Sequence, residues 1–306
     1  MTTPRDRGTF ASGLLYFVEL RAVLDRHAQI GEQAMSAVEH WKSTVERHHE
    51  QSLRAMGEAG PPSDFWRPLA SAFRADPGRT DDEVLDRLKR EVKPDQTLLD
   101  VGGGAGRFAL ALALGCRSVT VAEPSESMLE QLDEASKEAG IANVKKVQGN
   151  WEDVEVEPAD VVLCSHVVYG TTDIVPFIRK LASHARDRVL MLSFVSSPQS
   201  HLAPFWTLVH GEERVNLPAL PELVNVMWEV GIYPDLEMFD ASDRQVFDSR
   251  EAAVEQLRGR LWVAPHTEAD HRLQQAAEEL LEDCDGGVAI REAGARRQGL
   301  ISWHPA

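Results

Sequence analysis

A chain of 306 residues that is 43% hydrophobic and 26% charged can form one large α/β domain with an appended helical region, or two modest domains. Its formal net charge of -17 argues against a nucleic-acid partner, because an acidic surface repels a phosphate backbone. The apolar runs are too short to span a bilayer, and the three cysteines form no CxxC pair. We therefore expect a cytoplasmic protein without a membrane segment, a disulfide framework or a metal site.

A helical pattern covers residues 14–56 near the start of the chain. Its apolar positions recur at spacings of three and four between charged residues: Ile30, Ala34, Val38, Trp41 and Val45. Such a stripe can pack on its own domain or on a second subunit, in which case the chain would form a homodimer. The His48-His49 pair lacks the partner spacing that would complete a metal shell, so we expect it on a solvated helix face.

The helical pattern breaks at residues 59–62, which read AGPP. A second helical piece is expected over residues 64–74, and a capped helix is expected to start at Thr80. These segments lie before the first strand of the predicted sheet. We assign residues 1–93 to a helical N-terminal region that serves as a lid or in dimerisation, and residues 94–306 to the main domain.

From residue 97 onward, short apolar strands alternate with helical patterns, which is typical of βαβ units and a parallel sheet. The first strands are expected at 97–101, 118–122, 144–148, 160–165 and 188–194, with helices at 125–139 and 174–185. Further on we expect helices at 220–230, 251–260 and 271–283, and strands at 235–239, 245–247 and 298–303. The predicted fold class is α/β, a Rossmann-like, doubly wound, mostly parallel sheet with a helical N-terminal extension.

The first predicted strand runs into a glycine turn and then into a helix. Glycine lacks Cβ and tolerates positive φ, so the backbone can approach a ligand closely, and the helix directs its free N–H groups at the same place. Two patterns overlap here. One is Asp100-x-Gly102-x-Gly104-x-Gly106, and the other is Gly104-x-Gly106-x-x-Ala109, a permissible dinucleotide fingerprint. Both predict a nucleotide-type ligand, but only the first includes the acidic residue.

Three segments in chain order resemble the class I S-adenosylmethionine-dependent methyltransferases. They are residues 98–107 (LLDVGGGAGR), 119–128 (VTVAEPSESM) and 159–166 (ADVVLCSH). By motif the resemblance covers roughly residues 95–195. It implies a parallel sheet with an antiparallel strand near its carboxyl end, and S-adenosylmethionine lying across the ends of the first strands.

The resemblance also implies roles for single residues. Asp100 would help to hold the methionine amino group of the cofactor, and the backbone of Gly102, Gly104 and Gly106 would pack against it. Glu123 ends the second predicted strand, where a carboxylate can accept hydrogen bonds from both ribose hydroxyls.

Five more residues are expected at the adenine end of this cofactor. Pro124 and Met128 would lie near the adenine, although Met128 can equally be a core residue. Many family members have aspartate where Asn150 stands, and the Asn carbonyl can accept the same bond from the adenine amino group. Trp151 either stacks on the adenine or caps the core edge. Ser165, at the end of the fourth strand, completes the predicted cofactor-binding set.

Methyl transfer from a sulfonium is an in-line displacement, so the protein mainly has to align the acceptor and the methyl group in a dry pocket. His166 is the candidate base or acceptor-positioning residue, because imidazole titrates near the working pH. The alternative is a histidine that bonds a neighbouring loop. Tyr169 lines the pocket or merely packs. Other residues predicted around a small, partly apolar acceptor are Phe65, Trp66, Trp206, His210, Glu213, Arg214 and Trp228.

We therefore predict a methyltransferase that uses S-adenosyl-L-methionine to methylate a small-molecule acceptor, with an acceptor-pocket insertion around residues 196–235. An Asn-Pro-Pro-Tyr-like tetrapeptide, which many nucleic-acid amino methyltransferases carry, is missing from the sequence. One alternative is an NAD-dependent oxidoreductase that would place Glu123 on the ribose. It is weakened by Asp100 and by the long helical region before the motif. Another is a non-catalytic, cofactor-binding scaffold that acts through its N-terminal helix.

Overall fold

The computed structural model describes residues 35–305 except 243–244, 292 and 294–295. The predicted helical residues before 35, including Ile30 and Ala34, lie outside the described part. A seven-stranded sheet forms the centre, in the order β3-β2-β1-β4-β5-β10-β6. Its strands are β1 (Thr97–Val101), β2 (Ser118–Glu123), β3 (Val144–Gln148), β4 (Ala159–Ser165), β5 (Ala185–Phe194), β6 (Asp235–Ser242) and β10 (Arg296–Trp303).

The first five strands pair in parallel, and β10 pairs antiparallel with both β5 and β6. Successive residues of a strand point to opposite faces, so the buried runs of β1 and β4 supply two cores. Leu98 belongs to one core and Leu99 to the other. This arrangement confirms the predicted Rossmann-like class, including the antiparallel strand near the carboxyl end.

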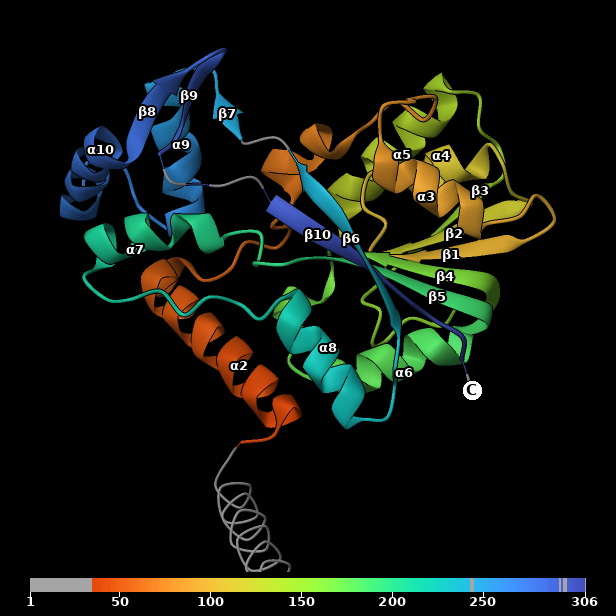
Figure 1. The fold of residues 1–306 in the computed structure, drawn as a ribbon. Coiled ribbons are helices and arrows are strands. Elements are labelled where there is room, and N and C mark those ends of the chain that lie inside the picture. The colour runs from red at the N-terminus through yellow and green to blue at the C-terminus, as the bar shows by residue number, and fades with distance from the viewer. Residues whose placement is uncertain (1–34, 243–244, 292, 294–295, 306) are drawn as a thin grey trace, which may run out of the picture.

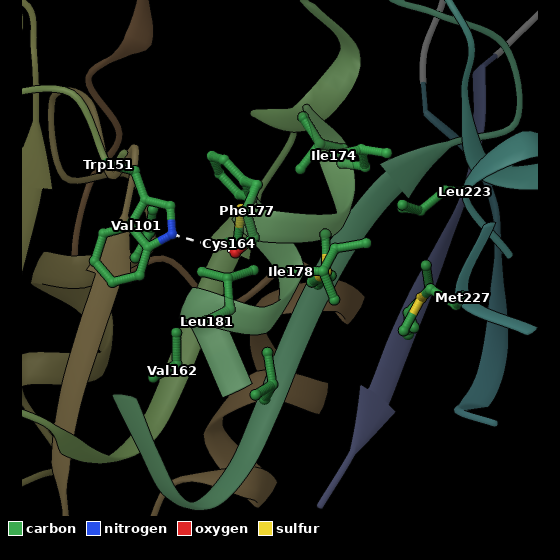
Figure 2. Close-up of a cluster of buried hydrophobic side chains, with 14 of the residues drawn as sticks. Val101, Trp151, Val162, Cys164, Ile174, Phe177, Ile178, Leu181, Leu223 and Met227 are labelled. Carbon is green, nitrogen blue, oxygen red and sulfur yellow. Dashed lines mark hydrogen bonds between the residues drawn. The ribbon is translucent and has the colours of Figure 1, made fainter. Parts of the chain in front are cut away.

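Helices cover both faces of the sheet (Figure 1). On one side lie α3 (Glu83–Glu91), α4 (Ala109–Ala113) and α5 (Glu126–Glu138). On the other side lie α6 (Ile174–His184) and α8 (Leu220–Glu229), and α2 (Ala37–Met56) packs against both of them. The side chains of α6 and α8 that enter the core of this second side are drawn in Figure 2.

Helix α2 begins with a capping box between Ser36 and Glu39. Trp41 and Val45 are fully buried within the subunit, and the Trp41 indole N–H donates to Thr171 O at 2.8 Å. The described part of the apolar stripe therefore packs on its own domain. A homodimer through the N-terminal helices stays a prediction.

The segment between α2 and the sheet differs in detail from the prediction. A short 3₁₀ helix η1 (Gly57–Ala59) follows α2, and the 3₁₀ helix η2 (Arg67–Phe73) replaces the α-helix expected over 64–74. Helix α3 is capped by Asp82, whose carboxylate accepts from Leu85 N, rather than by Thr80. Within the described residues, no helix combines the length and the apolarity needed to cross a bilayer.

A second, smaller sheet was not predicted. It has the order β7-β9-β8, from strands β7 (Val246–Phe247), β8 (Leu281–Cys284) and β9 (Gly287–Ile290). Helices α7 (Ala203–His210), α9 (Arg250–Leu261) and α10 (Glu268–Leu280) share a separate hydrophobic core with it, beside the main sheet (Figure 1). The helix expected to run to Asp283 ends at Leu280, because the chain turns there into the β8–β9 hairpin.

Candidate functional site

The glycine turn after β1 is built on backbone angles that favour glycine. Gly102, Gly104 and Gly106 have φ of 68°, 55° and 84°. A Cβ on Gly102 would lie 2.4 Å from the Val167 side chain, and one on Gly106 would lie 2.4 Å from Leu132. At Gly104 the nearest atom to such a Cβ would be the Met128 sulfur, 3.7 Å away. The turn is therefore tightly held on its inner side and open at Gly104.

Asp100 lies directly beneath this turn. Its side chain is buried, and its Oδ1 atom has no hydrogen-bond partner among the described residues. A Cβ on Gly103 would lie 2.7 Å from Asp100 Oδ2, which explains a third consecutive glycine that the sequence analysis left without a role. Burial, with a smaller contribution from Glu123, raises the pKa of Asp100 to about 8. A buried carboxyl group without a hydrogen-bond partner lowers the stability of the fold, and a cationic ligand would supply that partner.

Glu123 ends β2 on the other side of the turn and is buried. Its Oε2 accepts from Gly104 N at 3.0 Å, and its Oε1 accepts from Ser125 N at 2.9 Å. Each oxygen keeps a further lone pair for a ligand hydroxyl. Burial raises the pKa of Glu123, although the two backbone hydrogen bonds oppose this effect. The turn therefore has two buried carboxyl groups beside it, Asp100 and Glu123.

Asp64 of the N-terminal region also reaches this place, which the sequence analysis missed. Its carboxylate accepts from Ser125 Oγ at 2.9 Å and from Ser127 N at 3.1 Å, at the start of α5. Burial opposes ionisation, but the hydrogen bonds from Ser127, Ser125 and Trp66 outweigh it and lower the pKa of Asp64 to about 2. The N-terminal region is thus tied to the glycine turn. No local motif signals such a contact between distant segments.

The residues predicted at the adenine end lie in two kinds of environment. Pro124 and Asn150 are exposed at the ends of β2 and β3. Met128 is buried and packs with Ala70 of η2 and Ala105 of the turn, as a core residue would.

Trp151, also predicted at the adenine end, is buried against α6. Its indole N–H points to Phe177 O at 3.4 Å (Figure 2). The Lys180 ammonium lies 4.8 Å from its ring centre, and the His184 ring lies 5.0 Å away. These contacts match the alternative in which Trp151 caps the core edge.

His166 follows Ser165, the last residue of β4, and has a positive φ of 59°. Its Nδ1 lies 3.0 Å from Tyr169 Oη, and its Nε2 lies 3.0 Å from Gln298 Oε1. Tyr169 Oη accepts from Phe194 N at 2.8 Å, so its hydroxyl proton is available to His166 Nδ1. The proton of the neutral ring then sits on Nε2 and is donated to Gln298 Oε1. No pattern in the sequence predicts that Gln298 contacts His166.

Burial lowers the pKa of His166 to about 4, and the positive charges of Arg107 and Arg296 act in the same direction. The ring also stacks on Phe194, with centroids 4.0 Å apart. Both nitrogens of His166 are engaged, and the ring is neutral at pH 7. Its surroundings suit a side chain that positions a partner better than one that takes up a proton.

The residues predicted around the acceptor do not form one group. Trp206 and Arg214 meet, with the guanidinium carbon 3.8 Å from the ring centre. His210 lies beside Trp206, and its Nε2 contacts Leu261 O at 2.8 Å. Trp228 is 53% exposed on α8, and the Glu213 side chain is also exposed.

The other aromatic residues predicted around the acceptor, Phe65 and Trp66, and the predicted surface histidine His48 lie elsewhere. Phe65 and Trp66 contact each other, and Phe65 lies 6.1 Å from the Trp262 ring at the end of α9. His48 is 8% exposed and its Nδ1 lies 2.6 Å from Val215 O. The expectation that it sits on a solvated face is wrong, because the loop after α7 covers this part of α2.

Comparisons with known proteins agree with this geometry. Residues 98–188 match a family model described as a methyltransferase domain. An uncharacterized protein of Haemophilus influenzae is 28% identical over 198 residues, which cover 63% of this chain and 72% of that protein. YcgJ of Bacillus subtilis, named an uncharacterized methyltransferase, is 26% identical over 94 residues, or 30% of this chain and 37% of YcgJ. The structure of YjhP from Escherichia coli aligns with a TM-score of 0.51 at 16% identity, over 80% of this chain and 100% of that one, and shares its fold.

Proposed function

We propose that the chain, whose residues 98–188 match a methyltransferase domain, is a class I S-adenosylmethionine-dependent methyltransferase that methylates a small-molecule acceptor. The observation that carries the proposal is the acidic glycine turn. A buried carboxyl oxygen without a partner, a second buried carboxylate and an open glycine backbone meet at the ends of β1 and β2. This combination suits a ligand with a cation and a pair of hydroxyls.

The residues fit S-adenosylmethionine in a specific way. Asp100 Oδ1 would hold the methionine amino group, Glu123 would hold the ribose hydroxyls, and Gly104 would leave room for the cofactor against the backbone. When bound, the cofactor supplies a methyl group on a positively charged sulfur. The same features disfavour a dinucleotide, because Asp100 lies under the turn where a pyrophosphate would need positive partners.

The chain's own contribution at the carboxyl ends of β4 and β5 is to position the acceptor. Tyr169 and Gln298 fix the His166 ring through both nitrogens, and Phe194 covers one face of it. With a pKa of about 4, His166 is a poor proton acceptor at pH 7. Alignment in a water-poor site is therefore the main source of rate in this proposal, and the acceptor atom attacks with its own lone pair.

Calorimetry with S-adenosylhomocysteine tests the cofactor site. We expect binding to the wild-type chain, and we expect Asp100→Asn to weaken it by about tenfold or more, because the amide keeps an acceptor oxygen but loses the carboxylate charge opposite the ligand's amino group. Asp95→Asn is the matched control, since Asp95 is exposed just before β1. The proposal fails if neither S-adenosylmethionine nor S-adenosylhomocysteine binds.

A further inference from the structure

A pocket lies between α2, α7, the end of α9 and the loop after β5. It is a small depression partly open to solvent, and the 300 Å³ of space between its atoms includes that open solvent. Its polar lining includes His48, Ser197, Arg214 and Arg260, and Trp206 forms part of the wall. The described residues that line it include no aspartate or glutamate, although the chain has 49 acidic residues against 32 Lys and Arg. We call this site the arginine pocket.

Arg214 is held in the pocket by neutral partners. Its Nη2 donates to His48 Nε2 at 2.8 Å and to Ser52 Oγ at 2.7 Å, and its guanidinium lies over the Trp206 ring. His48 receives this bond on Nε2, so its proton is on Nδ1 and the ring is neutral. Among the described residues Arg214 forms no ion pair within 4.0 Å, and the nearby Glu212 pairs with Arg54 instead. Burial lowers the pKa of Arg214 to about 10.

Arg260 has still fewer partners. Its one hydrogen bond within the described part of the chain runs from Nη1 to Gln245 Oε1 at 3.4 Å. Burial and the charge of Arg296 lower its pKa, so its surroundings disfavour the positive charge. Trp206 Nε1 is buried as well and has no acceptor among the described residues. Two arginines thus line one pocket whose described lining contains no anionic side chain. Burying positive charge in this way costs folding stability unless a ligand supplies the negative charge.

A series of contacts connects the arginine pocket with the proposed acceptor position. Its Ser197 follows β5 by three residues, and the neighbouring Pro198 O accepts from Arg296 Nη1 at 3.4 Å. The Arg296 guanidinium also lies 5.5 Å from the Phe194 ring, and Phe194 stacks on His166. The chain passes from β5 into α7 along this edge of the sheet (Figure 1).

We propose that the acceptor carries an oxyanion group, a carboxylate or a phosphate, and that Arg260 and Arg214 bind this group in the arginine pocket. Arginine suits this role because its planar fork of N–H donors matches oxyanion geometry. With its oxyanion end bound in the arginine pocket, the acceptor would place its reacting atom near His166. This inference names the substrate class of the proposed methyltransferase and therefore rests on that function.

The test measures the thermal midpoint of the full chain in inorganic phosphate, in malonate and in sodium chloride at matched ionic strength. We expect phosphate or malonate to raise the midpoint by about 2 °C or more above chloride, because a ligand that binds only the folded state stabilises it. Arg260→Gln should abolish the increment, and Arg179→Gln, an exposed arginine on α6, should keep it. An increase in phosphate alone indicates that the acceptor carries a phosphate, and an increase in malonate alone indicates a carboxylate.

The inference is overturned if neither anion exceeds chloride, or if Arg260→Gln responds as the wild type does. Arg214→Gln is a second variant, but Arg260 is the decisive one because Arg214 also joins α2 to the following loop. S-adenosylhomocysteine binding, measured on the same samples, separates the two proposals. An anion response without cofactor binding refutes the methyltransferase function alone, and cofactor binding without an anion response refutes the oxyanion pocket alone.

Discussion

The glycine turn holds buried carboxyl groups and the arginine pocket holds guanidinium groups, and among the described residues each site has buried polar groups with few or no partners. At the turn these groups are carboxyls, of which Asp100 is the unpartnered one. At the pocket they are donors: Arg260 has a single hydrogen bond of 3.4 Å among the described residues, and Nε1 of the wall residue Trp206 has none. Stability alone favours pairing such groups or replacing them by apolar side chains. The difference in sign therefore indicates two different ligands, a cationic one at the turn and an anionic one at the pocket.

The largest effect that we expect concerns the steric basis of the turn. Gly102→Ala places a Cβ 2.4 Å from Val167 at a φ of 68°, and we expect the free energy of unfolding to fall by about 2–4 kcal/mol. Urea denaturation measures this loss. Adding Val167→Ala should restore part of it, since the clash is relieved and the backbone strain is not.

Gly259→Ala is the control for the same substitution near the arginine pocket. Gly259 lies inside α9 and a Cβ there meets nothing within 4 Å, so alanine should stabilise the chain by about 0.5–1 kcal/mol. Equal losses for Gly102→Ala and Gly259→Ala would contradict the view that the turn alone is built on glycine geometry.

A second effect follows from the raised pKa of Asp100. The folded state holds its proton up to about pH 8, whereas the unfolded chain loses it near pH 4, so the folded state binds more protons between these values. Stability without ligand should then fall as pH rises, by about 1.4 kcal/mol per pH unit for one proton. Denaturant titrations between pH 6.5 and 8 measure this slope.

This pH window separates Asp100 from the histidines. Burial lowers the pKa values of His48, His166 and His201 to about 4, so they make stability rise with pH, but only up to about pH 6.5. Asp100→Asn should flatten the profile above pH 6.5, and Asp95→Asn should leave it unchanged. A wild-type slope that persists in Asp100→Asn would show that another group causes it.

The two sites also differ in how far the sequence predicts them. The turn is encoded locally, because Asp100, the glycines and Glu123 follow the ends of adjacent strands in a short stretch of chain. The arginine pocket joins residues from α2, α7, α9 and two loops, so no spacing in the sequence reveals it. Trp206 and Arg214 were predicted near the acceptor, but Arg260 was not, and His48 was expected in solvent.

The small sheet was missed for a different reason. Asp285-Gly286 is a strong signal for a two-residue hairpin turn and lies between β8 and β9. The helix predicted over 271–283 covered three of the four residues of β8, so this strand was not predicted. The main sheet was predicted more completely because its strands are buried on both faces and read as apolar runs that end in glycine, proline or polar residues.

The smallest effect tests whether the two sites are independent, because the N-terminal region touches both. Asp64 caps the start of α5 beside the glycine turn, whereas α2 forms a wall of the arginine pocket. Asp64→Ala should cost about 1 kcal/mol, as the loss of a helix cap does, and should weaken S-adenosylhomocysteine binding severalfold in calorimetry. The phosphate or malonate increment should not change, since no contact of Asp64 reaches the pocket. Asp81→Ala, at an exposed aspartate of the same region, should alter neither property. If Asp64→Ala also removes the anion response, the turn and the pocket are coupled through the N-terminal region, and the two ligands would then bind cooperatively.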